Sequence, residues 1–157
     1  FKIAFLLRMI PVFFVQSGLQ NASSLNKKSE KKFKNYISRY FKIGLLSTFV
    51  IAIITNLFSD YIIYLFANEE IVYSSKILSH LSFIPFFAML NFKNLVFILV
   101  NDLKSILNKA TFWTLIFMIF LSIILCKKYG GLGLAYSLLL TEIFSFSIHL
   151  FLIKRNE

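Results

Sequence analysis

The chain is poor in cysteine and in acidic residues. Cys126 is the single cysteine among 157 residues, so neither an internal disulfide nor a cysteine-based metal site can form. Seven Asp and Glu residues stand against seventeen Lys and Arg residues, which gives a formal net charge of +10. A nucleic-acid-binding protein would spread such basic residues over a soluble face with interleaved aromatic residues, whereas these basic residues cluster between apolar runs. We therefore expect no nucleic-acid partner.

The motifs of soluble enzymes are also absent from the sequence. It contains no GxxxxGK[ST] phosphate loop, no HExxH zinc motif and no CxxC pair. The stretch Gly130-Gly131-Leu132-Gly133 does not fit a dinucleotide-binding fingerprint. We therefore expect no enzyme activity, no catalytic residue, no bound metal and no cofactor.

Apolar residues, in contrast, are abundant. Hydrophobic residues make up 58% of the chain, against about 45–50% in an average soluble domain. A helix needs about 20 mostly apolar residues to cross the hydrocarbon core of a membrane. Five segments meet or approach that length, and they span residues 3–20, 43–66, 77–100, 110–128 and 132–153. The sequence predicts an all-α integral membrane protein, a bundle of about five transmembrane helices.

The connections between these segments are short. The longest runs from Asn21 to Lys42, and none is large enough for a separate globular domain. Residues 1–157 are therefore expected to form a single membrane domain. The chain begins with Phe1, without a charged region and cleavage site of a secretory signal, and we expect it to be a fragment of a longer protein.

Basic residues predict the orientation, because short cytoplasmic connections are enriched in Lys and Arg. Alternate connections and the C-terminal tail carry eleven: Lys27, Lys28, Lys31, Lys32, Lys34, Arg39, Lys42, Lys104, Lys109, Lys154 and Arg155. The opposite side carries four: Lys2, Lys76, Lys127 and Lys128. This count predicts an N-terminus on the outer side of the membrane and a C-terminus on the cytoplasmic side.

Two basic residues lie inside predicted membrane segments, namely Arg8 in the first and Lys93 in the third. Arg or Lys near the centre of a membrane helix costs about 2.5–3.5 kcal/mol even on the lowest scales. Both are candidates to line a polar cavity. The alternative is that their long side chains reach out to the headgroups. Pro85 in the third segment predicts a kink or a break.

Polar residues in the third and fifth segments fall on common helix faces. Asn91 and Asn94 lie with Lys93 in one broad polar sector of the third segment. Glu142 and His149 share a face of the fifth segment with small residues. Helix packing, with Glu142 protonated or hydrogen-bonded to a neighbour, is one explanation of that face. A proton relay is the other.

Three stretches resemble the polysaccharide (O-antigen type) flippases of the multidrug/oligosaccharidyl-lipid/polysaccharide exporter superfamily. They are MIPVFFVQSGLQNASSLNKKSEKKFKNYISRYFK, SDYIIYLFANEEIVYSSKILSHLSFIPFFAMLN and KKYGGLGLAYSLLLTEIFSF. The first resembles the family's helix, basic cytoplasmic loop and long following helix. The second resembles its short interfacial segment before an L-x-x-I-P region, and the third its YG-x-x-G-x-A turn into the last helix.

The resemblance implies a fold of two six-helix bundles around a central cavity, with both termini cytoplasmic. The chain would supply helices eight to twelve and would work with the missing N-terminal lobe of the same protein. It also implies a polyprenyl-pyrophosphate-linked oligosaccharide as the cargo, with membrane lipids around its tail. Arg8 and Lys93 are the cations hypothesised to hold the pyrophosphate, and Asn91, Asn94, Glu142 and His149 are further cavity candidates.

Three alternatives remain at this point. A cation-coupled drug or small-molecule antiporter of the same superfamily would use acidic cavity residues, a role open to Glu142. A membrane-embedded glycosyltransferase or polymerase would need a sizeable extramembrane loop, which the sequence lacks outside its cytoplasmic connections. A membrane assembly subunit without a transport pathway would tolerate neutral replacement of Arg8, Lys93 and Glu142.

Overall fold

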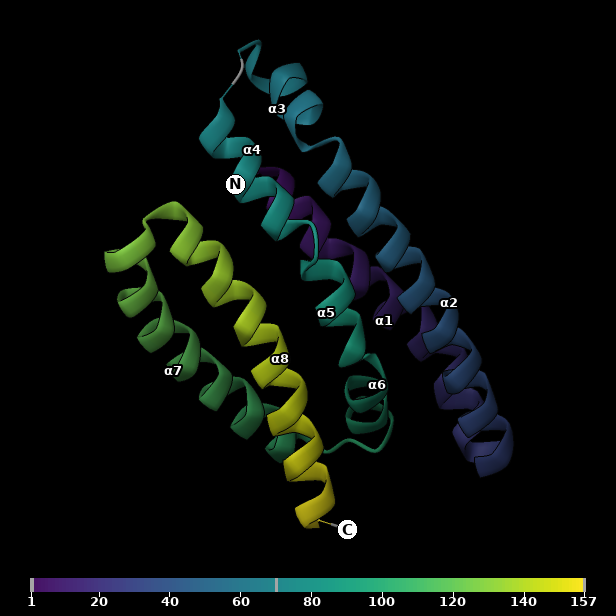
Figure 1. Ribbon diagram of the computed structural model, residues 1–157. Helices are drawn as coiled ribbons and strands as arrows, with labels where there is room; N and C mark the ends of the chain where they lie inside the picture. The colour runs from purple at the N-terminus through teal and green to yellow at the C-terminus, as the bar shows by residue number, and fades with distance from the viewer. Residues whose placement is uncertain (1, 70, 157) are drawn as a thin grey trace.

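The computed structural model describes residues 2–69 and 71–156, and these residues form helices without any strand (Figure 1). The helices are α1 (Lys2–Lys28), α2 (Glu30–Leu57), α3 (Ser59–Ala67), α4 (Val72–Leu81), α5 (Ile84–Leu90), α6 (Phe92–Val100), α7 (Lys104–Tyr129) and α8 (Gly131–Asn156). The predicted all-helical fold class is confirmed.

Three helices of the described chain are long and apolar enough to cross a membrane: α2, α7 and α8. A fourth span results if Val72–Leu90 and Phe92–Val100 are counted as one bent span. The helix α1 is not among the three. A multi-pass membrane protein with three or four spans is supported, and the predicted bundle of five spans is not confirmed.

The predicted polar connection from Asn21 to Lys42 is helical almost throughout. The helix α1 continues to Lys28, and α2 begins directly after Ser29, whose extended backbone (φ −168°, ψ 119°) separates the two helices. The Ser29 hydroxyl accepts a long 3.5 Å hydrogen bond from the Lys32 amide. Lys and Glu have good helix propensity, so these two helices extend beyond their apolar parts.

The predicted second segment, 43–66, is interrupted. The helix α2 ends at Leu57, Phe58 takes a non-helical conformation (φ −101°, ψ 17°), and α3 begins at Ser59. The helix α3 ends at Ala67, and the following residue, Asn68, has the left-handed conformation (φ 55°) that commonly stops a helix.

The predicted third segment, 77–100, consists of α4, α5 and α6. Pro85 lies in the first turn of α5, where its missing N–H interrupts no helical hydrogen bond. The predicted break at Pro85 is therefore confirmed. A larger bend of 41° separates Val72–Leu90 from Phe92–Val100 at Asn91, a position that carries no proline or glycine.

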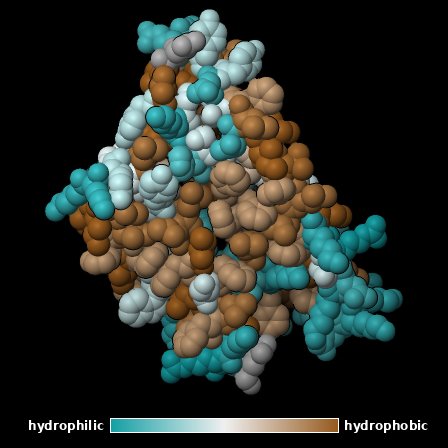
Figure 2. Space-filling model, viewed as in Figure 1, coloured by the Kyte–Doolittle hydropathy of each residue, from teal (hydrophilic) through white to brown (hydrophobic). Residues whose placement is uncertain are grey.

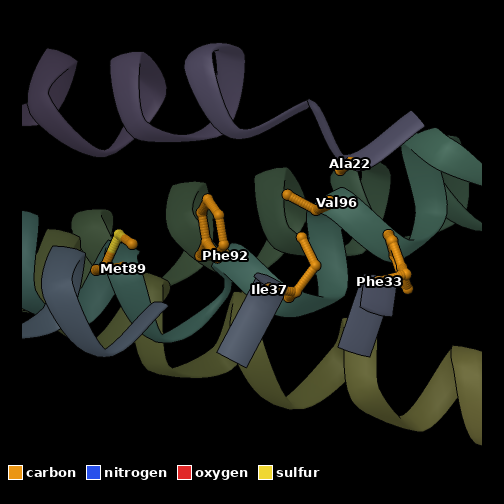
Figure 3. Packing of buried hydrophobic residues seen from close by; sticks show 6 residues of the cluster. All are labelled: Ala22, Phe33, Ile37, Met89, Phe92 and Val96. Carbon is orange, nitrogen blue, oxygen red and sulfur yellow. The ribbon is translucent and has the colours of Figure 1, made fainter. Parts of the chain in front are cut away.

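Two helical hairpins enclose this bent run. The hairpin of α1 and α2 packs against α5 and α6, α8 packs against α4, α5 and α6 from the other side, and α7 packs mainly on α8 (Figure 1). One buried apolar cluster joins the first hairpin to the bent run: Ala22, Phe33, Ile37, Met89, Phe92 and Val96 (Figure 3). A second joins α4 and α5 to α8: Leu81, Ile84 and Ala135. The bent run is thus the centre of the bundle.

The hairpin of α7 and α8 depends on glycine. Gly130 turns the chain with a positive φ of 58°, a conformation that glycine adopts without strain. A Cβ at Gly133 would stand 2.1 Å from the carbonyl oxygen of Leu125, so the two backbones approach too closely for any side chain. The Ser122 and Ser137 hydroxyls meet at 2.9 Å farther along the hairpin.

The outward surface is apolar over much of the bundle. Large side chains of α7 are exposed, among them Phe112, Trp113, Ile119, Phe120 and Ile123. On the face shown in Figure 2, apolar residues cover the middle and polar residues gather toward the ends. Exposed apolar surface of this extent is typical of contact with another protein or with lipid, and α7 is also a candidate span.

Candidate functional site

A cavity of about 570 Å³ lies between α1, the α5 and α6 helices of the bent run, and the hairpin of α7 and α8. We call it the Arg8 cavity. Its apolar wall comes from side chains such as Val12, Leu95 and Met118. Its polar wall consists of Arg8, Gln16, Asn91, Thr111, Thr114, Thr141, Glu142, Ser145 and His149. Four of the predicted site residues, Arg8, Asn91, Glu142 and His149, therefore lie around one space.

An ion pair crosses this cavity. The Nη2 atom of Arg8 on α1 lies 3.3 Å from Oε1 of Glu142 on α8. The Arg8 side chain is 52% exposed and that of Glu142 is 13% exposed. The Glu142 side chain is therefore largely buried in the wall, while the Arg8 side chain as a whole is about half exposed.

The position of Glu142 along α8 shows how far the ion pair lies from the ends of that helix. Glu142 stands eleven positions after Gly131 and fourteen before Asn156, so it lies near the middle of α8. At 1.5 Å per residue, it is about 17 Å from the start of the helix. In a membrane crossed by α8, Arg8 would be directed toward the middle of the bilayer. This geometry favours the cavity interpretation of Arg8 over contact with headgroups.

A second polar group surrounds the bend at Asn91. The Asn91 side-chain amide donates to the Ser145 hydroxyl at 3.3 Å, and the Asn94 amide donates to the Asn91 side-chain oxygen at 3.2 Å. The Asn94 amide also lies 3.5 Å from the Phe146 carbonyl oxygen. The bonds to Ser145 and Phe146 attach the bend to α8.

His149 belongs to the same group. Its Nδ1 lies 2.7 Å from the Ser145 carbonyl oxygen and 3.1 Å from the Asn91 amide nitrogen. A carbonyl only accepts and an amide N–H only donates, so one Nδ1 cannot satisfy both in a neutral ring. The two groups compete for the ring, and each choice corresponds to a different tautomer of His149.

Two buried polar atoms of the cavity residues lack a partner. Among the residues that the structure describes, the His149 Nε2 and the Thr114 Oγ1 are buried without a hydrogen bond. Buried polar groups are paired in the great majority of cases, so each unpaired one requires an explanation. Both residues line the Arg8 cavity, where a polar ligand is one source of the missing bonds.

Lys93 does not line the Arg8 cavity. It is exposed, and it lines a second groove between α1, α2, α6 and α8 whose volume is about 670 Å³. Its Nζ stands 4.5 Å from the centre of the Phe41 ring. The structure thus places the two predicted cations in different spaces, while Asn94 lines the second groove and is bonded to Asn91 of the first.

Sequence reasoning missed four polar residues of the Arg8 cavity: Gln16, Thr111, Thr114 and Thr141. Thr111 and Thr114 are three positions apart and so share a face of α7, which is a signal that the sequence contained. No sequence signal marks Thr141. Its hydroxyl donates to the Ser137 carbonyl within α8, as threonine commonly does in membrane helices.

Within the described residues, no group of three or more His, Cys, Asp or Glu side chains is arranged to hold a metal ion. The site is instead a polar cavity that contains one cation, one acid, hydroxyls and amides among apolar helices. No family model, curated protein or solved structure matches the chain.

Proposed function

We propose that this chain forms one wall of a transport pathway that moves a lipid-linked oligosaccharide across the bacterial inner membrane. The observation that carries the proposal is the Arg8 cavity, in which an ion pair and many polar side chains lie beside α7 and α8, two helices long and apolar enough to span a membrane. Ionisable groups inside a membrane typically mark substrate or ion pathways.

Arg8 is the group we assign to the pyrophosphate of the cargo. A guanidinium presents several N–H donors in a planar fork that fits phosphate oxygens. The Arg8 side chain is 52% exposed beside Glu142, so it has room for a second anion. The hydroxyls and amides of the cavity wall are suited to the sugar hydroxyls, and the apolar outer faces to the lipid tail.

The proposal includes a second wall. In the exporter superfamily that the sequence resembles, two lobes enclose the cavity, and the missing N-terminal lobe would face α1 and α8. The helix α1 is then the fifth membrane span, and its junction with α2, together with the C-terminus, lies in the cytoplasm. The eleven basic residues counted for that side support this orientation.

Replacement of Arg8 tests the proposal in cells. The gene that encodes this chain is expressed in a bacterial strain that lacks its own oligosaccharide flippase, and the surface polysaccharide is quantified. Arg8→Ala should reduce the polysaccharide at least about tenfold, as expected for the loss of a charged hydrogen-bonding partner. Arg155→Ala, which removes an exposed arginine at the end of α8, is the matched control. Unchanged polysaccharide with Arg8→Ala, at equal protein level, would refute the proposal.

A cation-coupled antiporter is the second candidate, and Glu142 is the observation that favours it. An antiporter of this kind needs an acid in the cavity, and the Glu142 carboxylate lines it. The two candidates predict different results for Glu142→Gln. A coupled antiporter should lose cation-dependent transport, whereas a pathway that needs only the cation of Arg8 should keep its activity.

A further inference from the structure

The groove that holds Lys93 is lined by both apolar and polar side chains. We call it the Lys93 groove, and its volume is about 670 Å³. Its apolar lining residues are Phe33, Ile37, Phe97 and Ile153. Its polar and charged lining residues are Asn26, Glu30, Lys34, Ser38, Lys93, Asn94 and Asn101. A ligand that fits this lining has an apolar part and a polar part.

Lys93 is the basic residue of α6, a helix that is otherwise almost entirely apolar. Its ammonium packs over the Phe41 ring at 4.5 Å, which orients it without neutralising its charge. No ion pair among the described residues involves Lys93. The groove therefore presents a cation whose counter-ion is not supplied by the described part of the chain.

The surroundings of the groove are basic. The end of α1 and the first half of α2 carry Lys27, Lys28, Lys31, Lys32, Arg39 and Lys42, and the end of α8 carries Lys154 and Arg155. Asn26 of α1 and Ser38 of α2 line the groove. Among the described residues, the acids at this end are paired: Glu30 with Lys34 at 2.6 Å and Asp102 with Lys104 at 3.2 Å. Figure 2 shows polar side chains gathered over the α1–α2 junction, at the lower right of the view. The net positive charge attracts an anion.

We propose that the Lys93 groove binds an anionic phospholipid. The phosphate lies on the Lys93 ammonium, with the Ser38 hydroxyl as a further donor from the same groove, and an acyl chain runs along Phe97 and Ile153. The apolar lining residues distinguish a lipid from a soluble phosphate, because a free phosphate would leave these side chains uncovered. Anionic lipids are the usual partners of basic clusters at the ends of membrane helices. This site is independent of the transport proposed for the Arg8 cavity.

Lipid retention by the full chain tests the proposal. The purified chain in detergent is mixed with phosphatidylglycerol or with phosphatidylcholine, and bound lipids are counted by native mass spectrometry. The unchanged chain should retain phosphatidylglycerol preferentially, and Lys93→Gln should lower that affinity by about fivefold, the expected effect of one basic residue. Lys93→Arg should restore it, and Lys109→Gln, at an exposed lysine outside the groove, should leave it unchanged. Equal retention by the unchanged chain and by Lys93→Gln would overturn the proposal.

A second pair of variants leaves Lys93 untouched. Ser38→Glu places an acid in the groove, whereas Asn35→Glu places the same charge on an exposed position of α2 outside the groove. Ser38→Glu should weaken phosphatidylglycerol retention more than Asn35→Glu, and equal effects would contradict a defined site. Glycerol phosphate, which carries the headgroup chemistry without tails, should not displace the lipid at millimolar concentration. Displacement would identify a soluble-phosphate site and overturn the lipid assignment.

Discussion

At the scale of single residues, the ion pair of Arg8 and Glu142 has two unequal members. Glu142 is 13% exposed and Arg8 is 52% exposed. Breaking a buried pair is costly mainly because the remaining charge is left without compensation. Loss of Arg8 leaves a carboxylate in the wall, whereas loss of the Glu142 charge leaves a guanidinium that still reaches open space.

This difference in burial predicts which of two single variants loses more free energy of unfolding. Arg8→Gln should lower the free energy of unfolding in detergent by about 1–3 kcal/mol, and Glu142→Gln should lower it by less than about 1 kcal/mol. The double variant should recover part of the loss caused by Arg8→Gln. Unfolding followed by circular dichroism measures all three, and a larger loss for Glu142→Gln would contradict the described burial.

Asn91 and His149 provide a second prediction at this scale. Their side chains lie 3.1 Å apart and join the bend of the central run to α8. A double-mutant cycle of Asn91→Ala and His149→Ala should give a coupling free energy of about 0.6 kcal/mol, the average for hydrogen bonds between membrane helices. The matched control pairs Asn91→Ala with Asn56→Ala, whose amide bonds instead to the Ser79 carbonyl. Coupling no larger than in the control would mean that the Asn91–His149 contact does not form.

Only part of the candidate site could be predicted from the sequence. Arg8, Glu142, Asn91 and His149 stand out because each is a polar residue in an apolar run. Their partners do not, because the pairing of α1 with α8 depends on how distant helices pack. For the same reason the sequence could not show that Lys93 and Arg8 line different spaces.

At the scale of elements, the α7–α8 hairpin was the easiest to predict and the α1–α2 junction the hardest. Long apolar runs bounded by lysines and glycines define α7 and α8 closely. The residues of the junction are polar with good helix propensity, so a solvent-exposed helix and a loop have similar sequences there. The bend at Asn91 was missed because no proline or glycine marks it, and because the hydrogen bonds of Asn91 to α8 join residues far apart in the sequence.

The close approach of α7 and α8 predicts a strong effect at one glycine. Gly133→Ala places a Cβ 2.1 Å from the backbone oxygen of Leu125, which cannot move away alone. It should destabilise the hairpin by about 1–3 kcal/mol, as overpacking does. Gly131→Ala is the control, because its Cβ meets the flexible end of the Ile77 side chain at 2.8 Å. Thermal unfolding in detergent should show the smaller shift for the control, and equal shifts would contradict the packing.

At the scale of the whole molecule, a broad apolar surface lies between polar ends (Figure 2). The helix α7 is the clearest case, because it packs on α8 along one side and exposes large apolar side chains on the other. Its position at the outside of the bundle is also visible in Figure 1. If the bundle sits in a bilayer, this face contacts lipid.

Trp113 reports on that contact, because it is the single tryptophan of the chain and is 52% exposed on α7. In reconstituted vesicles, lipids with brominated acyl chains should quench its fluorescence strongly, and the water-soluble quencher acrylamide should quench it weakly. The opposite pattern would place α7 outside the bilayer, or against a protein partner that also excludes the lipid.

The proposed transport is tested most directly by lipid-linked oligosaccharide movement in vesicles that contain the protein to which this chain belongs. A fluorescent polyprenyl-pyrophosphate sugar on the inner leaflet becomes accessible to an added lectin only after it crosses the bilayer. We predict that the unchanged protein moves it, that Arg8→Gln reduces the rate at least about tenfold, and that Arg8→Lys retains an intermediate rate. Equal rates for the unchanged protein and Arg8→Gln would contradict the role of the Arg8 cavity.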